Sequence, residues 1–170
     1  VCGQVCMSTA DDVDQAVRVS TEAAREWGAT PVPKRSQVMF RFKRLLEENS
    51  DKLARIISRE HGKTHDDALG EMVRGVEVVE FACGIPQLMK GTFSEQVAAG
   101  IDVYSFPQPL GVVAGITPFN FPAMVPMWMY PNALVCGNAF LLKPSERDPS
   151  ASLFMADLLK QAGLPDGVFN

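Results

Sequence analysis

The stretch from Val103 to Leu142 contains no charged residue, and it constrains the fold more than any other part of the sequence. A long uncharged apolar run is the usual sign of a membrane-spanning helix. Here prolines interrupt every window of that length, at Pro107, Pro109, Pro118, Pro122, Pro126 and Pro131. The side-chain amides of Asn120 and Asn138 would also need hydrogen-bond partners in lipid. We therefore expect no membrane as a partner and predict a buried parallel sheet with an apolar crossover helix.

This stretch and the residues after it divide into alternating strands and helices. The short apolar run 110–116 predicts a central strand that is buried on both faces. A turn at 117–121 leads to a helix at 122–135, since proline suits the first position of a helix. A second buried strand is expected at 139–142 and a third begins near 168. The order is that of a parallel α/β unit.

Apolar residues recur at helical spacing in several stretches of the first half. Thr9 with the acids after it predicts a helix start, and Gly62 predicts a helix end. Ser50 and Ser150 are expected to cap two further helices. The first four helices, expected at about 9–27, 38–46, 50–61 and 69–83, should form the outer layer of the α/β domain.

Charge and cysteine content exclude several classes of partner. The net charge is −4, with 20 acids against 16 bases, and the bases alternate with acids, so we expect no nucleic acid. The cysteines match no zinc spacing, and His61 and His65 lie far from them, so we expect no metal. Reduced thiols in a reducing compartment are the expected state. The cysteines are Cys2, Cys6, Cys83 and Cys136.

Polar segments follow both predicted strands. Thr117 to Asn120 follow the first strand, and Lys143 to Arg147 follow the second. Ligands of parallel α/β sheets bind at the carboxyl ends of the strands. The two segments are therefore expected to converge on one ligand.

Asn120 is the strongest candidate for catalysis. Its side-chain amide offers two N–H donors, and the helix N-terminus that follows favours negative charge. An oxyanion that develops during a reaction would be stabilised there, and losing one such donor costs about 3–4 kcal/mol of barrier. The alternative is an ordinary capping or turn asparagine, which the pattern alone favours.

Glu146 is a candidate for binding a nucleotide ribose. An acid near the end of the second strand of a dinucleotide-binding fold bonds the ribose hydroxyls, and it would repel the 2′-phosphate of NADP. The alternative is a solvated charge pair with Lys143. The glycine fingerprint G-x-G-x-x-G is absent, because Gly111 and Gly115 lie within the predicted strand.

Two segments of the sequence resemble motifs of the aldehyde dehydrogenase superfamily. Gly115-Ile-Thr-Pro-Phe-Asn-Phe-Pro122 resembles the motif around its oxyanion asparagine, and Gly137-Asn-Ala-Phe-Leu-Leu-Lys-Pro-Ser-Glu146 resembles its ribose-binding strand. Phe119 in place of the usual Trp, the helix around Trp128, and Arg74-Gly-Val-Glu-Val-Val-Glu-Phe81 are similar to the methylmalonate-semialdehyde dehydrogenase family. The similarity runs over essentially the whole chain.

The resemblance implies a fold, a cofactor and a set of site residues. It implies an aldehyde dehydrogenase-like fold with a partial Rossmann-like NAD-binding domain, a parallel sheet and N-terminal helices. Asn120 would hold the oxyanion, Arg74 would bind a substrate carboxylate, and Phe121 and Trp128 would line the aldehyde tunnel. By pattern alone, Arg74 is an exposed helix charge and Trp128 is core. The positions that match NAD contacts are Thr117, Phe119, Lys143, Glu146 and Arg147.

The resemblance also implies a reaction and its partners. The substrate is a malonate or methylmalonate semialdehyde, NAD accepts the hydride, coenzyme A (CoA) accepts the acyl group, and carbon dioxide is lost. The assembly is a homo-oligomer, a dimer or a tetramer. The compartment is the cytoplasm, or the mitochondrial matrix in a eukaryote.

We expect residues 1–170 to be an incomplete N-terminal NAD-binding domain, with 97–108 in a small oligomerisation sheet. The resemblance places the nucleophilic cysteine beyond residue 170, so the chain alone is expected to be inactive. Two alternatives stay open. One is a hydrolytic aldehyde dehydrogenase that uses water in place of CoA, and the other is a non-catalytic NAD-binding or interaction module.

Overall fold

A parallel pair of strands, β3 (Val112–Ile116) and β4 (Ala139–Lys143), lies at the centre of the structure, a computed structural model that describes residues 3–170. The two strands pair in register from Val112 with Ala139 to Ile116 with Lys143. Helix α5 (Met124–Val135) makes the crossover between them. Phe169 forms a parallel bridge with Phe140 of β4, where the next strand of the sheet would lie. The expected α/β order is confirmed.

The prediction that the first of these strands is buried on both faces is wrong for this chain. Within the described residues β3 has β4 as its single neighbour, so it is an edge strand. Ile116 at its end is 76% exposed, and Gly115 is the one buried residue of the strand. The continuous apolar sequence predicted a central strand, whereas in the described residues one edge of β3 has no paired strand.

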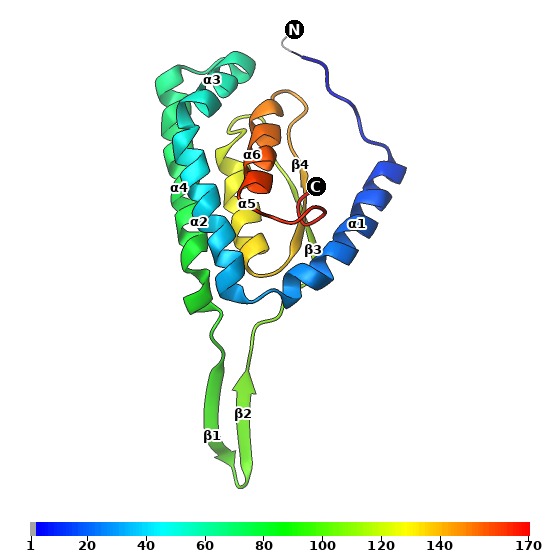
Figure 1. The fold of residues 1–170 in the computed structure, drawn as a ribbon, viewed down its shortest axis with the longest axis vertical. Coiled ribbons are helices and arrows are strands. Elements are labelled where there is room, and N and C mark those ends of the chain that lie inside the picture. The colour runs from blue at the N-terminus through cyan, green and yellow to red at the C-terminus, as the bar shows by residue number, and fades with distance from the viewer. Residues whose placement is uncertain (1–2) are drawn as a thin grey trace.

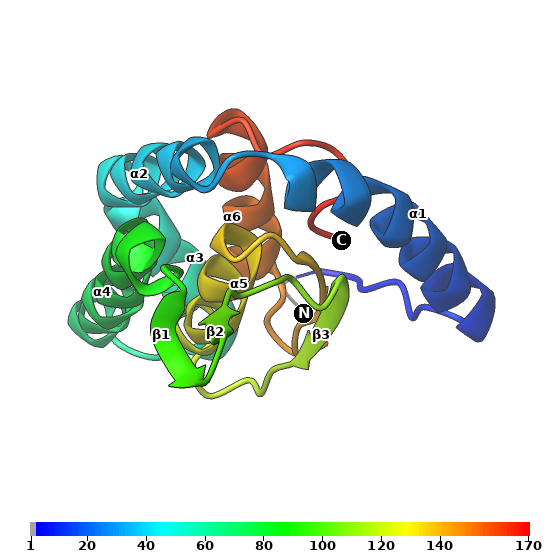
Figure 2. The ribbon, with the colours of Figure 1, turned by 90° about the horizontal axis from the view of Figure 1, so that it is seen from below.

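Five further helices surround the strands, and Figures 1 and 2 show α2 and α4 side by side, with α5 and α6 between them and the strands. Helix α1 lies on the other side of the strands. The predicted existence of these helices is confirmed, with longer bounds for α2 and α4 than the sequence suggested. Their bounds are α1 (Ala10–Ala29), α2 (Val32–Glu48), α3 (Ser50–His61), α4 (His65–Leu88) and α6 (Ser150–Gln161).

Local sequence signals set several helix ends. The Thr9 side chain accepts from the Asp12 N–H while Asp12 accepts from the Thr9 N–H, which is a capping box. Gly62 ends α3 with φ 88°, a left-handed conformation that favours glycine. Both signals act as the sequence predicted.

Other predicted helix starts are wrong, and at α6 a tertiary contact replaces the local cap. Ser50 is the first residue of α3 and makes no capping bond. Ser150 does not cap α6 either, because its N–H and hydroxyl both donate to the Glu60 carboxylate of α3. The crossover helix begins at Met124 rather than at Pro122. The apolar residues of the α6 sequence also predict a buried face that includes Leu153, but Leu153 is 61% exposed.

The core lies between α2, α4, α5 and α6, and Tyr130 is its largest fully buried side chain. Its ring centroid is 4.9 Å from that of Phe169 and 6.1 Å from that of Phe42. Complete burial raises the pKa of Tyr130, so the phenol stays neutral. Burying a side chain of this size contributes roughly 1.5–3 kcal/mol. The core therefore fixes α5, and with it the turn that precedes α5.

A hairpin projects from the body, as Figure 1 shows. It consists of β1 (Thr92–Ala98) and β2 (Ile101–Ser105), which pair antiparallel in a sheet of their own. Residues 101–105 of the segment 97–108, which was expected in a small sheet, thus form a strand. Its partner β1 begins before residue 97 and escaped prediction. Within β1, Gln96 has a positive φ of 49° and the register shifts between Ser94 and Ala98. Every residue of both strands is exposed.

None of the helices within residues 3–170 is both long enough and apolar enough to cross a bilayer.

Cys2 lies outside the described residues, so the prediction of a reduced thiol there has no structural counterpart. Cys6, Cys83 and Cys136 are free cysteines. In the described part of the chain no group of His, Cys, Asp and Glu could hold a metal ion.

Candidate functional site

The two polar turns leave the sheet at the same edge. Ile116 and Lys143, the last residues of β3 and β4, are paired in register. Beyond them the Thr117 N–H donates to the Lys143 carbonyl at 3.1 Å. The expectation that the segments from Thr117 and from Lys143 converge is therefore confirmed as geometry. The roles of their side chains stay predictions.

Phe119 connects the two turns. The guanidinium carbon of Arg147 lies 4.6 Å from the Phe119 ring centroid, a cation–π arrangement. The His61 ring stacks on the same ring with centroids 6.4 Å apart. Phe119 is nevertheless 44% exposed. A flat aromatic surface thus stands between the strand ends, where part of it is open to a ligand.

Lys143 and Glu146 form an ion pair at the second turn, with Nζ 2.8 Å from Oε2. Both side chains are about half exposed. The hydrogen bond from Lys143 holds the pKa of Glu146 below its usual value, so this carboxylate is charged at neutral pH. It can accept hydrogen bonds from ligand hydroxyls and it repels a second negative charge.

Thr117 lies at the base of the same edge. It is 4% exposed, and its hydroxyl has no hydrogen-bond partner within residues 3–170. A buried hydroxyl without a partner costs free energy unless a ligand or water satisfies it. The role of Thr117 as a contact of a bound ligand stays a prediction.

Asn120 is exposed in the turn that precedes α5. The turn is held in place, because the carbonyl oxygen of Asn120 accepts a hydrogen bond from Lys63 Nζ at 3.1 Å. The helix N-terminus that follows favours negative charge nearby. An amide donor at this place can stabilise an oxyanion if a substrate carbonyl is bound beside it.

Phe121 lies beside two cations. The Arg74 guanidinium carbon is 5.6 Å from its ring centroid, and Lys63 Nζ is 4.5 Å from it. Arg74 is exposed and donates to the Gly70 carbonyl of its own helix at 3.2 Å. The structure thus brings Arg74 to the residue next to Asn120, where a substrate carboxylate could be bound.

Trp128 is 50% exposed on the second turn of α5, so the alternative of core packing is wrong for this chain. No aromatic or cation contact within residues 3–170 joins it to Phe121. In the described structure no ring or cation contact joins Trp128 to another predicted site residue.

Three residues around this turn escaped prediction from the sequence: Lys63, Glu71 and His61. Glu71 is fully buried on α4, where it accepts from the N–H of Ala123 and of Met124. One signal was present, because Glu71 occupies a stripe of otherwise small or apolar positions. That stripe is Ala68, Glu71, Met72, Gly75 and Val79, all buried.

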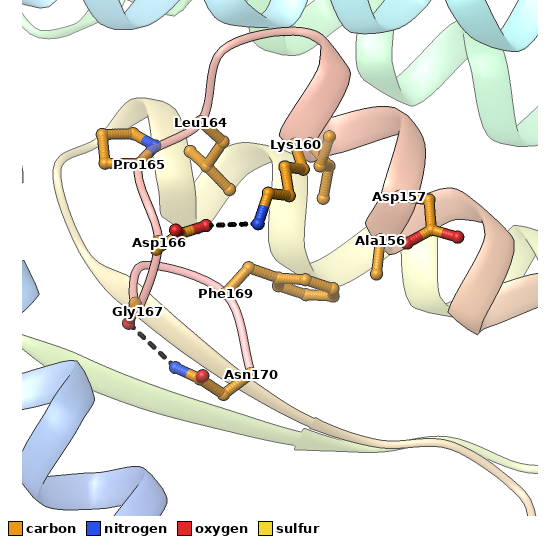
Figure 3. A pocket seen from close by; sticks show the side chains of 10 residues that line it. Ala156, Asp157, Lys160, Leu164, Pro165, Asp166, Gly167, Phe169 and Asn170 are labelled. Atoms are coloured by element: carbon orange, nitrogen blue, oxygen red, sulfur yellow. Dashed lines mark hydrogen bonds and ion pairs between the residues drawn. The ribbon is translucent and has the colours of Figure 1, made fainter.

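A pocket of about 310 Å³ lies elsewhere, beside the end of α6 and the C-terminal loop (Figure 3). The Phe169 ring lines it, and Lys160 pairs with Asp166 at 3.1 Å at its rim. None of the predicted site residues lines this pocket. It is therefore separate from the strand-end site.

A parallel strand–helix–strand unit with polar turns at one edge is typical of nucleotide-binding α/β proteins. The chain matches the aldehyde dehydrogenase family over residues 1–170, and it belongs to that family. Of solved structures, it is similar to methylmalonate-semialdehyde dehydrogenase from Oceanimonas doudoroffii, with 57% identity and a TM-score of 0.94 over 96% of this chain and 34% of the other.

Two further relatives are similar to nearly the whole of this chain. A chain from Sinorhizobium meliloti 1021, whose structure is a complex with NAD, is 52% identical with a TM-score of 0.95, over 98% of this chain and 34% of its own. Malonate-semialdehyde dehydrogenase from Pseudomonas aeruginosa is 53% identical over 167 residues, which are 98% of this chain and 34% of the relative. The chain thus spans about a third of the length of the relatives it matches.

Proposed function

We propose that this chain supplies the NAD-binding edge and the oxyanion donor of an aldehyde dehydrogenase that acts on malonate or methylmalonate semialdehyde. The observation that carries the proposal is the common edge at which the turns from Thr117 and from Lys143 leave paired strand ends. The similarity to semialdehyde dehydrogenases over nearly the whole chain supports the substrate class.

NAD fits the residues at this edge. The charged Glu146 suits the ribose hydroxyls and disfavours a 2′-phosphate, while Lys143 holds the carboxylate in place. Thr117 and the exposed part of the Phe119 ring, which contacts Arg147, complete the set of proposed contacts. When bound, NAD would accept the hydride of the aldehyde.

Asn120 would donate its amide N–H to the oxygen of the substrate carbonyl as negative charge develops there. Arg74 would bind the carboxylate at the other end of the semialdehyde, with Phe121 and Trp128 beside the aldehyde. These assignments place the reacting carbonyl next to the N-terminus of α5.

The nucleophilic cysteine would come from outside residues 1–170. Cys83 is buried and donates to the Val79 carbonyl. Cys136 follows the C-terminus of α5, whereas Asn120 precedes the N-terminus of this 12-residue helix, so about 18 Å of helix separates them. Burial raises the pKa of both thiols, which disfavours the reactive thiolate. The chain alone should be inactive.

CoA is the proposed acyl acceptor, with loss of carbon dioxide from the substrate. Water as acceptor is the competing proposal. The exposed hairpin β1–β2 is the proposed contact of a homo-oligomer, since an isolated two-stranded ribbon with every residue exposed is marginally stable alone. Free thiols suit a reducing compartment, the cytoplasm or a mitochondrial matrix.

The test is a chimera in which this chain replaces the matching third of the Oceanimonas doudoroffii enzyme. We expect NAD-dependent oxidation of malonate semialdehyde that accelerates when CoA is added. Asn120→Ala should slow NADH formation in the first turnover by about 10²–10³-fold, as for other oxyanion donors, while the Kd for NAD changes little. A rate that is indifferent to CoA would favour the hydrolytic reaction. A folded chimera without any dehydrogenase activity would favour a non-catalytic binding module.

A further inference from the structure

An ion pair lies directly behind the Asn120 turn. Glu71 on α4 is 0% exposed, and its Oε2 atom is 2.6 Å from Nζ of Lys63, whose side chain is 11% exposed. Taking charges out of water is costly unless each has close partners. The remaining contacts of this pair show what it holds together.

Glu71 binds the start of α5. Its Oε1 atom accepts from the N–H of Ala123 at 2.8 Å and from the N–H of Met124 at 3.0 Å. The first N–H groups of a helix have no acceptor within the helix, and Ala123 carries no side-chain acceptor of its own. A carboxylate 52 residues away in sequence therefore takes the place of a local cap.

Lys63 binds the other end of the same turn. Its Nζ donates to the Asn120 carbonyl at 3.1 Å and lies 4.5 Å from the Phe121 ring centroid. One carboxylate and one ammonium thus fix the backbone of the turn on both sides of Phe121. The Asn120 carbonyl is held by Lys63, and the N–H groups at Ala123 and Met124 are held by Glu71.

We propose that Glu71 and Lys63 are positioning residues, which hold the Asn120 turn so that its side-chain amide points at the reacting carbonyl. The inference rests on the oxyanion role proposed for Asn120. Donors of this kind act because they are in place before charge develops. A displacement of about 1 Å can cost on the order of 10²-fold in rate. Neither residue needs to touch the substrate.

Two variants test this, and each removes a different set of the contacts made by Glu71 and Lys63. Glu71→Gln keeps one oxygen that can accept from Ala123 and Met124, but its amide nitrogen cannot accept from Lys63. Lys63→Met removes both the bond to the Asn120 carbonyl and the ion pair with Glu71. In the chimera, we expect each to lower the rate of first-turnover NADH formation by about tenfold or more while the KM for NAD stays within about twofold. Lys63→Arg, which keeps a donor, should restore much of the rate.

A double-mutant cycle with Asn120→Ala decides whether the pair acts through Asn120. If it does, Glu71→Gln and Lys63→Met slow the enzyme with Asn120 present and add less than about twofold once Asn120→Ala is made. Equal losses in both backgrounds would overturn the positioning role and leave the oxyanion role intact. If Asn120→Ala alone has no effect, the proposed oxyanion role fails instead.

Glu47→Gln is the matched control, because Glu47 pairs with Lys43 at 2.8 Å on α2, away from the turn. Its rate should equal that of the parent chimera. Should Glu71→Gln fail to fold, the cycle is run with Lys63→Met, whose side chain lies nearer the surface. A Lys63→Met variant with the full rate would then contradict the proposal.

Discussion

The guanidinium of Arg147 lies over the ring of Phe119, with its carbon 4.6 Å from the ring centroid. The contact joins the turn after β4 to the turn after β3, so it sets the spacing between the two parts of the proposed NAD site. A cation over an aromatic face contributes about 0.5–1 kcal/mol at exposed sites.

Arg147→Gln in the chimera should therefore raise the Kd for NAD about fivefold, because the turns lose the contact that spaces them. Arg147→Lys should have a smaller effect than Arg147→Gln, since an ammonium keeps a cation–π contact with the ring even though it stacks less well than a guanidinium. Calorimetry with NAD measures both. Arg44→Gln, which removes an exposed ion pair with Glu48 on α2, is the control and should leave the Kd unchanged.

Asp148 should make stability depend on pH. Both of its carboxylate oxygens are buried without a hydrogen-bond partner among residues 3–170. Burial raises the pKa of Asp148 above its ordinary value of 3.8 and outweighs the Ser145 and His61 side chains, which lower it. A carboxyl whose pKa is higher in the folded state favours folding at low pH, and that advantage is lost as pH rises through the folded pKa.

Asp148→Asn should accordingly be more stable than the parent at pH 7, by about 1 kcal/mol, because no charge is buried. The difference should shrink as pH falls through the folded pKa and become constant below the ordinary value of 3.8, where the parent carboxyl is protonated in both states. Guanidinium unfolding of the chain at several pH values measures it. A difference that is constant with pH would contradict the assignment to Asp148.

Arg35 holds the connection between α1 and α2 against the end of α5. It is 3% exposed, and its Nε donates to the Val135 carbonyl at 2.9 Å. Its Nη1 donates to the carbonyls of Gly28 at 2.9 Å and of Thr30 at 2.7 Å. A guanidinium can donate in several directions at once, whereas an ammonium on a single stem cannot reach both sides.

Arg35→Lys should therefore lower the free energy of unfolding by about 1–3 kcal/mol, and Arg35→Ala by more, since buried carbonyls lose their donor. Denaturant titration followed by circular dichroism gives the values. Arg18→Lys on the exposed face of α1 should change little. Equal stability of Arg35→Lys and the parent would refute this account.

The cysteines should differ in reactivity according to burial. Burial raises the pKa of the Cys83 and Cys136 thiols, so little thiolate forms at pH 8, whereas Cys6 is exposed. Iodoacetamide should label Cys6 on the order of tenfold faster than the other two in the folded chain. Mass spectrometry of the labelled peptides measures the rates, and in denaturant the rates should converge. Fast labelling of Cys136 in the folded chain would reopen it as a candidate nucleophile.

The sequence by itself determined the order of strands and helices and the positions of the polar turns. Hydrophobic runs bounded by glycine and proline locate β3, β4 and α5 to within about two residues, because these signals are local. The parallel order then placed the turns of Asn120 and Glu146 at one edge of the sheet. The parallel direction of the two strands is enough for this inference, because their carboxyl ends then lie at the same edge.

Only the tertiary structure decided what holds those turns in place. Glu71 binds the start of α5 across 52 residues, and Glu60 binds the start of α6 across 90. The apolar stripe on α4 marks Glu71 as an unusual position, but the sequence does not say which residues these carboxylates contact, since that depends on where two helices pack. The exposure of β3 was decided in the same way, because a strand's own residues do not say whether a neighbour pairs with its second edge.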